Sequence, residues 1–404
     1  MMHRGAITIL TSRVRIGLVL ASALLTGCSP PERLPAVPPE LQAEAEVAGM
    51  PGVRYTSVEP DFLRFVQDTL ESVRREQEAL AQAGHKGPLP PAHFLALSGG
   101  GDNGAFGVGL LNGWTESGAR PQFKVVTGVS TGALIAPFAF LGGKYDAQVK
   151  GIFTGISTKD VLSERSVLAA VLDDAMADNR PLWGLTEKHV TETMLRDIAA
   201  EHAKGRILLI GTTNLDTRRG VIWNIGKIAA SGHPKALALF RSILIASSAI
   251  PGAFPPVLIE VEAKGQRFHE MHVDGGASAQ VFLYPPQYKL GELAAAAGIK
   301  RERKLYIIRN AYMHPEWSEV ERRTMTIAGR AIASLIQTQG RGDLFRIFAL
   351  AQRDHVDFNL AYIPATFTAP HKEEFDNEYM RQLFQLGFDL AKAGYPWEKI
   401  PPGM

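Results

Sequence analysis

The sequence has only one cysteine, Cys28, among its 404 residues. A single cysteine cannot form an intramolecular disulfide, and it cannot supply a metal site that needs several thiolates. The chain also lacks an excess of either charge, because 43 lysines and arginines stand against 41 acidic residues. Nucleic-acid binding usually requires a concentrated basic face, since phosphate contacts need many cations. We therefore expect no nucleic-acid partner.

The N-terminal apolar run is too short to span a bilayer comfortably. Residues 16–25 follow a basic start and precede the sequence Leu-Thr-Gly-Cys at residues 25–28. Small residues before the thiol are what a signal-type cleavage site requires. The segment resembles a bacterial lipoprotein signal, which implies removal of residues 1–27 and lipid modification of Cys28. An ordinary signal peptide, or a membrane anchor with an incidental cysteine, is the alternative.

Removal of this segment would take away Arg4, Arg13 and Arg15 and leave 40 basic against 41 acidic side chains. The residue after Cys28 is Ser29 and not an aspartate, which by resemblance to lipoprotein sorting patterns favours the outer membrane. We therefore expect a near-neutral, lipid-anchored protein of the bacterial cell envelope that faces the periplasm.

Composition and periodicity divide the rest of the chain. The prolines of residues 28–60 indicate an extended tether without chemistry. Residues 61–91 predict an amphipathic helix and linker, in which Asp61 is the N-cap and Gly84 the stop. Residues 92–315 predict a catalytic domain, and residues 316–404 a mainly helical extension packed on it.

Short apolar runs alternate with helical stretches inside this domain. The expected strands lie at residues 94–97, 123–127, 207–212, 221–225, 268–273 and 305–308. The expected helices lie at residues 134–140, 161–175, 320–339, 343–353 and 378–393. Alternating strands and helices predict an α/β fold with three α/β/α layers and a mostly parallel central sheet.

The sharpest chemical signal is the sequence Gly-Val-Ser-Thr-Gly at residues 128–132, between an apolar run and a helical stretch. A nucleophile elbow needs this context, because its serine stands at a strained strand-to-helix turn. Glycines two residues before and after it, here Gly128 and Gly132, avoid conflict with the neighbouring backbone. The pattern predicts Ser130 as a nucleophile.

A glycine-rich loop lies upstream, directly after the apolar run at residues 94–97. Its glycines are Gly99, Gly100, Gly101 and Gly104. Consecutive glycines let backbone N–H groups converge on a phosphate or on the oxyanion of an acyl intermediate. A P-loop is disfavoured because no Gly-Lys-Ser/Thr follows. A dinucleotide loop is disfavoured because a second glycine turn follows instead of a ribose-binding acid.

The third signal is Asp274, which leaves an apolar run into the turn formed by Gly275 and Gly276. The two glycines would let the carboxylate approach Ser130 closely. An aspartate of ordinary pKa is a weak base toward a hydroxyl, so it needs a dry site and a stabilised alkoxide.

In this order, the three signals resemble the patatin-like phospholipase family over roughly residues 93–310. Residues 212–217 and 246–256 resemble family segments as well. The resemblance implies a Ser130–Asp274 dyad, with Gly99, Gly100, Gly101 and Gly104 as the oxyanion loop. It implies hydrolysis of lipid esters, as by a phospholipase A or lysophospholipase, at a membrane surface and without a metal or organic cofactor. The family usually has Lys or Arg where this chain has Asn103.

Two other functions remain open at this stage. An esterase of the α/β-hydrolase type would add a downstream histidine to form a Ser-Asp-His triad. The candidates are His269, His272, His314, His355 and His371, and we interpret each of them as structural or solvated. A lipid-binding envelope lipoprotein without catalysis is the second alternative.

A basic run and a phenylalanine beside two prolines each allow a structural and a functional interpretation. Residues 300–304 (Lys-Arg-Glu-Arg-Lys) are the densest basic run, which we interpret as a solvated helix end. Contact with an anionic headgroup is the alternative. Phe254 lies beside Pro255 and Pro256, and we interpret it as a residue that packs in the core. The alternative is that it lines an acyl pocket.

Overall fold

A computed structural model describes residues 33–56, 59–164, 175–314, 317 and 319–404. Cys28 and the predicted leader lie outside the described residues, as does most of the helix predicted at residues 161–175. Within the described part, nine strands form one sheet in the order β1-β7-β6-β3-β2-β10-β11, and β9 joins β6 and β8 beside that path. The neighbours β6, β3, β2, β10 and β11 are mutually parallel.

The strands of the sheet are β1 (Arg54–Tyr55), β2 (Ala92–Leu97), β3 (Val125–Val129), β6 (Ile207–Asn214), β7 (Arg219–Asn224), β8 (Val257–Ala263), β9 (Gln266–Asp274), β10 (Arg303–Tyr312) and β11 (Asp357–Ile363). A separate short pair is formed by β4 (Ser163–Glu164) and β5 (Ala177–Asp178).

The α-helices are α2 (Glu59–Gln82), α3 (Gly104–Glu116), α4 (Thr131–Leu141), α5 (Asp146–Gly155), α6 (Thr158–Val161), α8 (Arg180–His189), α9 (Glu192–Ala203), α10 (Ile225–Ala230), α11 (Ala236–Ser247), α12 (Leu290–Ala296), α13 (Thr324–Arg353) and α14 (Asn377–Lys392). Four 3₁₀ turns are η1 (Pro39–Leu41), η2 (Gly101–Asn103), η3 (Gly143–Tyr145) and η4 (Gly275–Ala277).

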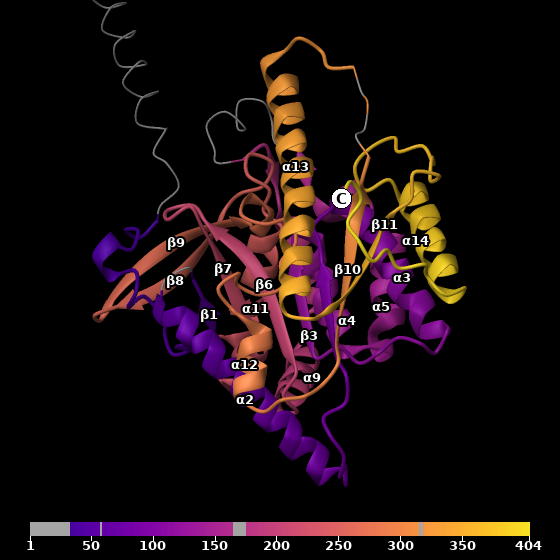
Figure 1. Cartoon of the computed structure of the whole chain (residues 1–404). Helices are drawn as coiled ribbons and strands as arrows, with labels where there is room; N and C mark the ends of the chain where they lie inside the picture. The colour runs from indigo at the N-terminus through magenta and orange to yellow at the C-terminus, as the bar shows by residue number, and fades with distance from the viewer. Residues whose placement is uncertain (1–32, 57–58, 165–174, 315–316, 318) are drawn as a thin grey trace, which may run out of the picture.

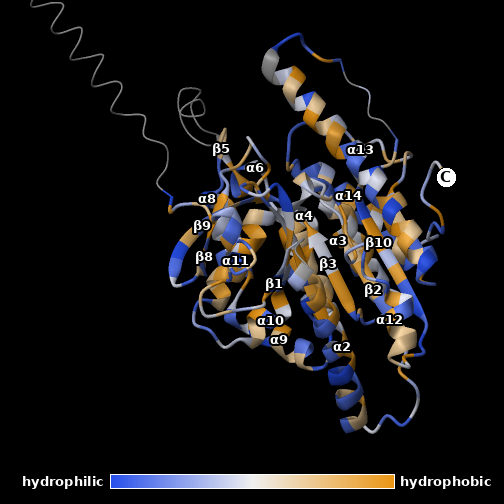
Figure 2. Ribbon diagram, turned by 60° about the vertical axis from the view of Figure 1, so that its left-hand side comes forward, coloured by the Kyte–Doolittle hydropathy of each residue, from blue (hydrophilic) through white to orange (hydrophobic). Residues whose placement is uncertain are grey.

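The sheet has a hydrophobic core on each face. Alternate residues of a strand point to opposite faces, so Leu95 and Leu97 of β2 join one core while Phe94 and Ala96 join the other. Helices α3, α4, α11 and α14 pack on the first face, and α2, α12 and α13 pack on the second, where α13 crosses in front of the sheet in Figure 1. Figure 2 shows the apolar β2 and β3 between these layers. The predicted three-layer α/β fold is confirmed.

Each of the six predicted strands is present, with shifted ends. The strand β11 is missing from the sequence prediction, although Leu360 and Ala361 are fully buried at the sheet edge beside β10. The predicted helix at residues 61–83 is α2, which begins at Glu59, so Asp61 lies inside it. There the Asp61 carboxylate accepts a hydrogen bond from the Thr56 backbone at 2.8 Å.

The tether prediction is wrong for residues 33–56. This segment packs on the domain through buried residues such as Val37, Val47 and Val53, and β1 extends the sheet through β7. Arg54 also forms a buried ion pair with Glu270 of β9. These apolar residues are isolated and aperiodic, so their burial depends on the surface that receives them.

The basic run at residues 300–304 is not a helix end. Helix α12 ends at Ala296, and the run leads into the first residues of β10. The two helices predicted at residues 320–339 and 343–353 form the single helix α13.

Helices α3 and α14 touch through their backbones. A Cβ atom at Gly109 of α3 would lie 2.0 Å from the carbonyl oxygen of Phe384, and one at Gly387 of α14 would lie 2.4 Å from that of Phe106. Both separations are far below van der Waals contact, so the helices need glycine at these positions to pack at this distance.

We expect Gly109→Ala to lower the free energy of unfolding by about 2 kcal/mol or more, because the added methyl group forces the two helices apart. Urea unfolding measures the change. Gly151→Ala in α5 is the matched control, since a Cβ there meets no atom within 4 Å. This control should gain up to about 1 kcal/mol from helix propensity. Equal stability of the two variants would contradict the prediction.

Candidate active site

Ser130 lies at a sharp turn between β3 and α4. Its φ angle is 55°, a conformation that is uncommon for a residue other than glycine and that a nucleophile elbow requires. A Cβ atom at Gly128 would lie 2.4 Å from the carbonyl oxygen of Gly132, and one at Gly132 would lie 2.4 Å from that of Leu97. The turn therefore needs both predicted glycines.

Asp274 ends β9 beside this turn. Val129, the last residue of β3, pairs with Gly211 of β6. The next residue of β6, Thr212, pairs with Asp274. Asp274 is 5% exposed, and its carboxylate accepts a hydrogen bond from the Gly276 amide at 2.7 Å. The Ser130 side chain lies close enough to this carboxylate to lower its pKa. The structure thus brings together the serine and the aspartate that the sequence predicts as a pair.

The electrostatic state of Asp274 follows from its burial. Loss of hydration raises the pKa of the Asp274 carboxyl to about 6, while the Ser130 side chain and the hydrogen bond from Gly276 oppose the rise. The raised pKa makes this aspartate a stronger base than a solvated one. It is still mainly ionised at neutral pH.

The glycine loop touches Ser130. A Cβ atom at Gly99 would lie 3.0 Å from the Ser130 Cβ. The Gly99 amide already donates to the Gln280 carbonyl at 3.2 Å, and the Gly104 amide donates to the Gly101 carbonyl. In the described part of the chain, the Gly100 and Gly101 amides have no protein acceptor. Of the four predicted loop glycines, only these two have free donors.

Gly100 and Gly101 also need glycine conformations, with φ angles of 156° and 58°. Contacts from the C-terminal part of the chain fix the residues that follow. The Asp102 carboxylate accepts hydrogen bonds from the Phe375 amide at 2.9 Å and contacts His371 Nε2 at 2.7 Å. Asn103, where the family usually has a cation, accepts one from the Tyr379 hydroxyl at 2.6 Å.

A cation nevertheless reaches the loop from β10. Arg309 is 5% exposed, and its Nη1 lies 3.4 Å from the Gly99 carbonyl oxygen, which also accepts a 2.7 Å hydrogen bond from the Ser98 hydroxyl. Burial lowers the pKa of Arg309 to about 10, although the charge of Asp343 opposes this, so the guanidinium stays protonated at neutral pH. No sequence pattern around the loop points to Arg309, because this residue follows the loop by more than 200 residues.

Ser247 is a second residue that the sequence analysis did not single out. Its hydroxyl accepts a hydrogen bond from the Ser130 amide at 3.0 Å and donates one to the Gly211 carbonyl at 2.6 Å. Two residues on, the Ala249 carbonyl accepts from the Asp274 amide at 2.9 Å. Both residues lie in the segment at 246–256. The resemblance of this segment to the family is the sequence feature that could have identified them.

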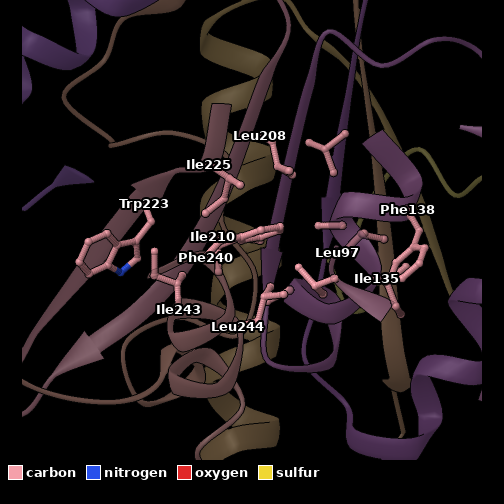
Figure 3. Close-up of a cluster of buried hydrophobic side chains, with 14 of the residues drawn as sticks. Leu97, Ile135, Phe138, Leu208, Ile210, Trp223, Ile225, Phe240, Ile243 and Leu244 are labelled. Atoms are coloured by element: carbon pink, nitrogen blue, oxygen red, sulfur yellow. The ribbon is translucent and has the colours of Figure 1, made fainter. Parts of the chain in front are cut away.

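An apolar cavity that is open to solvent lies at Ser130. Its walls come mainly from α4, α5, α8 and α11, and Figure 3 shows Phe138 and Leu244, two of the lining residues, within the buried cluster. Phe254 is packed in the hydrophobic core, as its simpler interpretation predicts, and it also lines the cavity. The cavity has the apolar lining that is typical of small-molecule sites.

The histidines predicted as candidates for a triad lie in other surroundings. Among the described residues, no histidine is hydrogen-bonded to Ser130 or Asp274. His272 is fully buried between Thr212 and Glu270, and His269 accepts from the Leu34 amide. His189, which the sequence analysis did not consider, lines the cavity and contacts Gln148.

Residues 95–285, just under half of the chain, match the family model for patatin-like phospholipases. This domain belongs to the patatin-like phospholipase family. Membership supports a lipid acyl hydrolase. Comparison with curated proteins gives no match.

Solved structures with detectable similarity include two bacterial proteins. VipD from Legionella pneumophila is 14% identical with a TM-score of 0.36, and the match covers 74% of this chain and 67% of VipD. The type III effector protein ExoU is 14% identical with a TM-score of 0.30, and the match covers 76% of this chain and 54% of ExoU. This chain therefore spans little more than half of the length of ExoU.

The raised pKa of Asp274 predicts a pH-dependent change in stability. Between the unfolded pKa near ~4 and the folded pKa of about 6, the folded protein keeps a proton that the unfolded chain has released. Ionisation of Asp274 therefore lowers stability as the pH rises through this window. Asp274→Asn removes this loss, so its stability relative to wild type should increase by on the order of 2–3 kcal/mol from pH 4 to pH 8.

Urea unfolding of both proteins at the two pH values measures this difference. Asp216→Asn is the control, because Asp216 is partly exposed and lies outside the site. A difference between Asp274→Asn and wild type that stays constant with pH would contradict the assigned pKa.

Proposed function

We propose that this protein hydrolyses the carboxylic ester bonds of lipids with Ser130 as nucleophile and Asp274 as base. The carrying observation is the proximity of the Ser130 side chain, at its strained turn, to the buried Asp274 carboxylate, beside two backbone donors and an apolar cavity. A phospholipid or lysophospholipid fits this arrangement, because its acyl chain can enter the cavity while its polar head stays outside.

The proposed acylation step uses these groups in sequence. The Asp274 carboxylate accepts the Ser130 proton as Oγ attacks the ester carbonyl carbon. The Gly100 and Gly101 amides stabilise the negative charge that develops on the carbonyl oxygen. The ester C–O bond then breaks, and the alcohol leaves with the proton held by Asp274.

Deacylation repeats the same transfers with water. Asp274 accepts a proton from the attacking water, and the Ser130 ester bond breaks as its oxygen regains that proton. The products are a free carboxylic acid and the original enzyme. The positive end of helix α4, which begins directly after Ser130, favours the anionic intermediates of both steps.

Ser130→Ala and Asp274→Asn should each lower kcat/KM for p-nitrophenyl esters and phospholipids by at least about a thousandfold. Wild-type kcat/KM should rise with pH around a midpoint near 6, because the base of the free enzyme must be ionised. A fluorophosphonate probe should label the wild type and not Ser130→Ala. Equal labelling or turnover by these two proteins would refute the assignment.

Histidine variants separate the dyad from a triad. His269→Gln, His314→Gln and His371→Gln should retain most activity, with folding checked by thermal denaturation. A loss above about a thousandfold at one histidine of a folded variant would favour the triad. A wild type that binds phospholipid and turns over no ester would favour the lipid-binding alternative.

We also propose that a lipid on Cys28 anchors the protein to the envelope, most favourably at the outer membrane. The support is the lipoprotein-like sequence at residues 25–28. Among the described residues, none of the helices combines the length and the apolar character that a membrane span needs. A lipid anchor would keep the site close to its substrate.

Cys28→Ala should move the protein from the membrane fraction to the soluble fraction of the cell, since the modified thiol is the attachment point. Palmitate labelling and cell fractionation measure this, and Ser29→Ala is the control that keeps the thiol. Absence of label from the wild-type protein would contradict the lipid anchor.

A further inference from the structure

A second apolar cavity lies at the opposite ends of the same strands. It lies between α2, α12 and the first residues of β2, β3, β6 and β10, is open to solvent, and shares no lining residue with the cavity at Ser130. Its apolar lining includes Phe65, Leu70, Phe94, Leu209, Leu290 and Leu293. Leu70 is 41% exposed, so the cavity reaches the surface beside α2.

Three cations line this second cavity, and one carboxylate serves two of them. Glu76 of α2 binds Arg301 through two hydrogen bonds of 2.8 and 2.9 Å, and it also binds Lys124 at 2.8 Å. The third cation, Arg303, makes no hydrogen bond or ion pair in the part of the chain that the structure describes. The cavity therefore combines apolar walls with an excess of positive charge.

The strand pattern directs Arg303 toward this cavity. Arg303, Leu305 and Ile307 alternate along β10, and both aliphatic residues belong to the core under α2, α12 and α13. Burial and repulsion from Arg301 lower the pKa of Arg303. Arg303 is half-buried, so its guanidinium can bind an anion at the mouth of the cavity while water solvates the rest of the group.

An arginine fork matches a carboxylate in shape and charge, and the apolar walls match a hydrocarbon chain. We propose that this second cavity binds a free long-chain fatty acid, with the chain inside and the carboxylate on Arg303. The site stands on its own geometry and does not depend on catalysis at Ser130. Hydrolysis of a lipid ester would supply its ligand. Arg303, which binds the carboxylate in this proposal, belongs to the basic run at residues 300–304.

The test is a fluorescence titration with cis-parinaric acid and its methyl ester. The Ser130→Ala background prevents ester hydrolysis. Saturable binding of the acid is expected, and Arg303→Met should weaken it about tenfold or more, because a charge-assisted hydrogen-bond pair is lost. Binding of the uncharged methyl ester should stay within about twofold of the parent, since it never used the guanidinium.

Two cavity-filling variants locate the bound chain. Ala294→Phe narrows the second cavity and should weaken both probes, whereas Leu134→Trp fills the cavity at Ser130 and should leave the Arg303-dependent binding intact. Circular dichroism and thermal denaturation verify that each variant is folded. Palmitate should displace the acid probe more effectively than palmitoyl-lysophosphatidylglycerol, whose bulky head does not fit the single guanidinium.

Three results would overturn the proposal. They are the absence of saturable acid binding, equal acid affinity with and without Arg303, and loss of binding in the Leu134→Trp variant alone. Stronger displacement by the lysophospholipid would reassign the site to phosphate headgroups and overturn the fatty-acid assignment. Esterase activity of the wild type is measured separately, so failure of this site is distinguishable from failure of the proposed function.

Discussion

The candidate site depends on backbone segments that approach each other too closely for any side chain. Gly132 packs against the carbonyls of Leu97 and Ser98, and Gly275 packs against the carbonyl of Gly211. These contacts draw the ends of β2, β3, β6 and β9 together, so that a serine, an aspartate and two free amides reach one point. The glycines are thus the structural condition for the geometry, and the polar residues supply the chemistry.

Much of this arrangement could be predicted from the sequence because its determinants are local. The elbow around Ser130 and the turn after Asp274 both need glycine within two residues of the functional side chain, and this leaves a readable pattern. The buried strands were equally clear, since they are short apolar runs between turns. Their order along the chain allowed the family resemblance to be recognised before the geometry was known.

The rest depends on contacts between distant segments, which leave no local pattern. Ser247 supports the elbow from α11, and Arg309 reaches the Gly99 carbonyl from β10. A cation therefore reaches the glycine loop from a residue that no motif around the loop reveals. Arg303 is a similar case: the sequence showed a basic run, and only the fold shows that one of its cations borders an apolar cavity without a partner.

The contacts of the glycine loop with the C-terminal segment have a consequence for folding. Asp102 and Asn103 meet His371, Phe375 and Tyr379, partners that lie 269 to 276 residues further along the chain. These contacts cannot form before residues 371–379 have been synthesised. The conformation of the glycine loop therefore depends on a segment that is made long after the loop itself. A nascent chain that has already completed Ser130 and Asp274 still lacks a finished site until its final helix emerges.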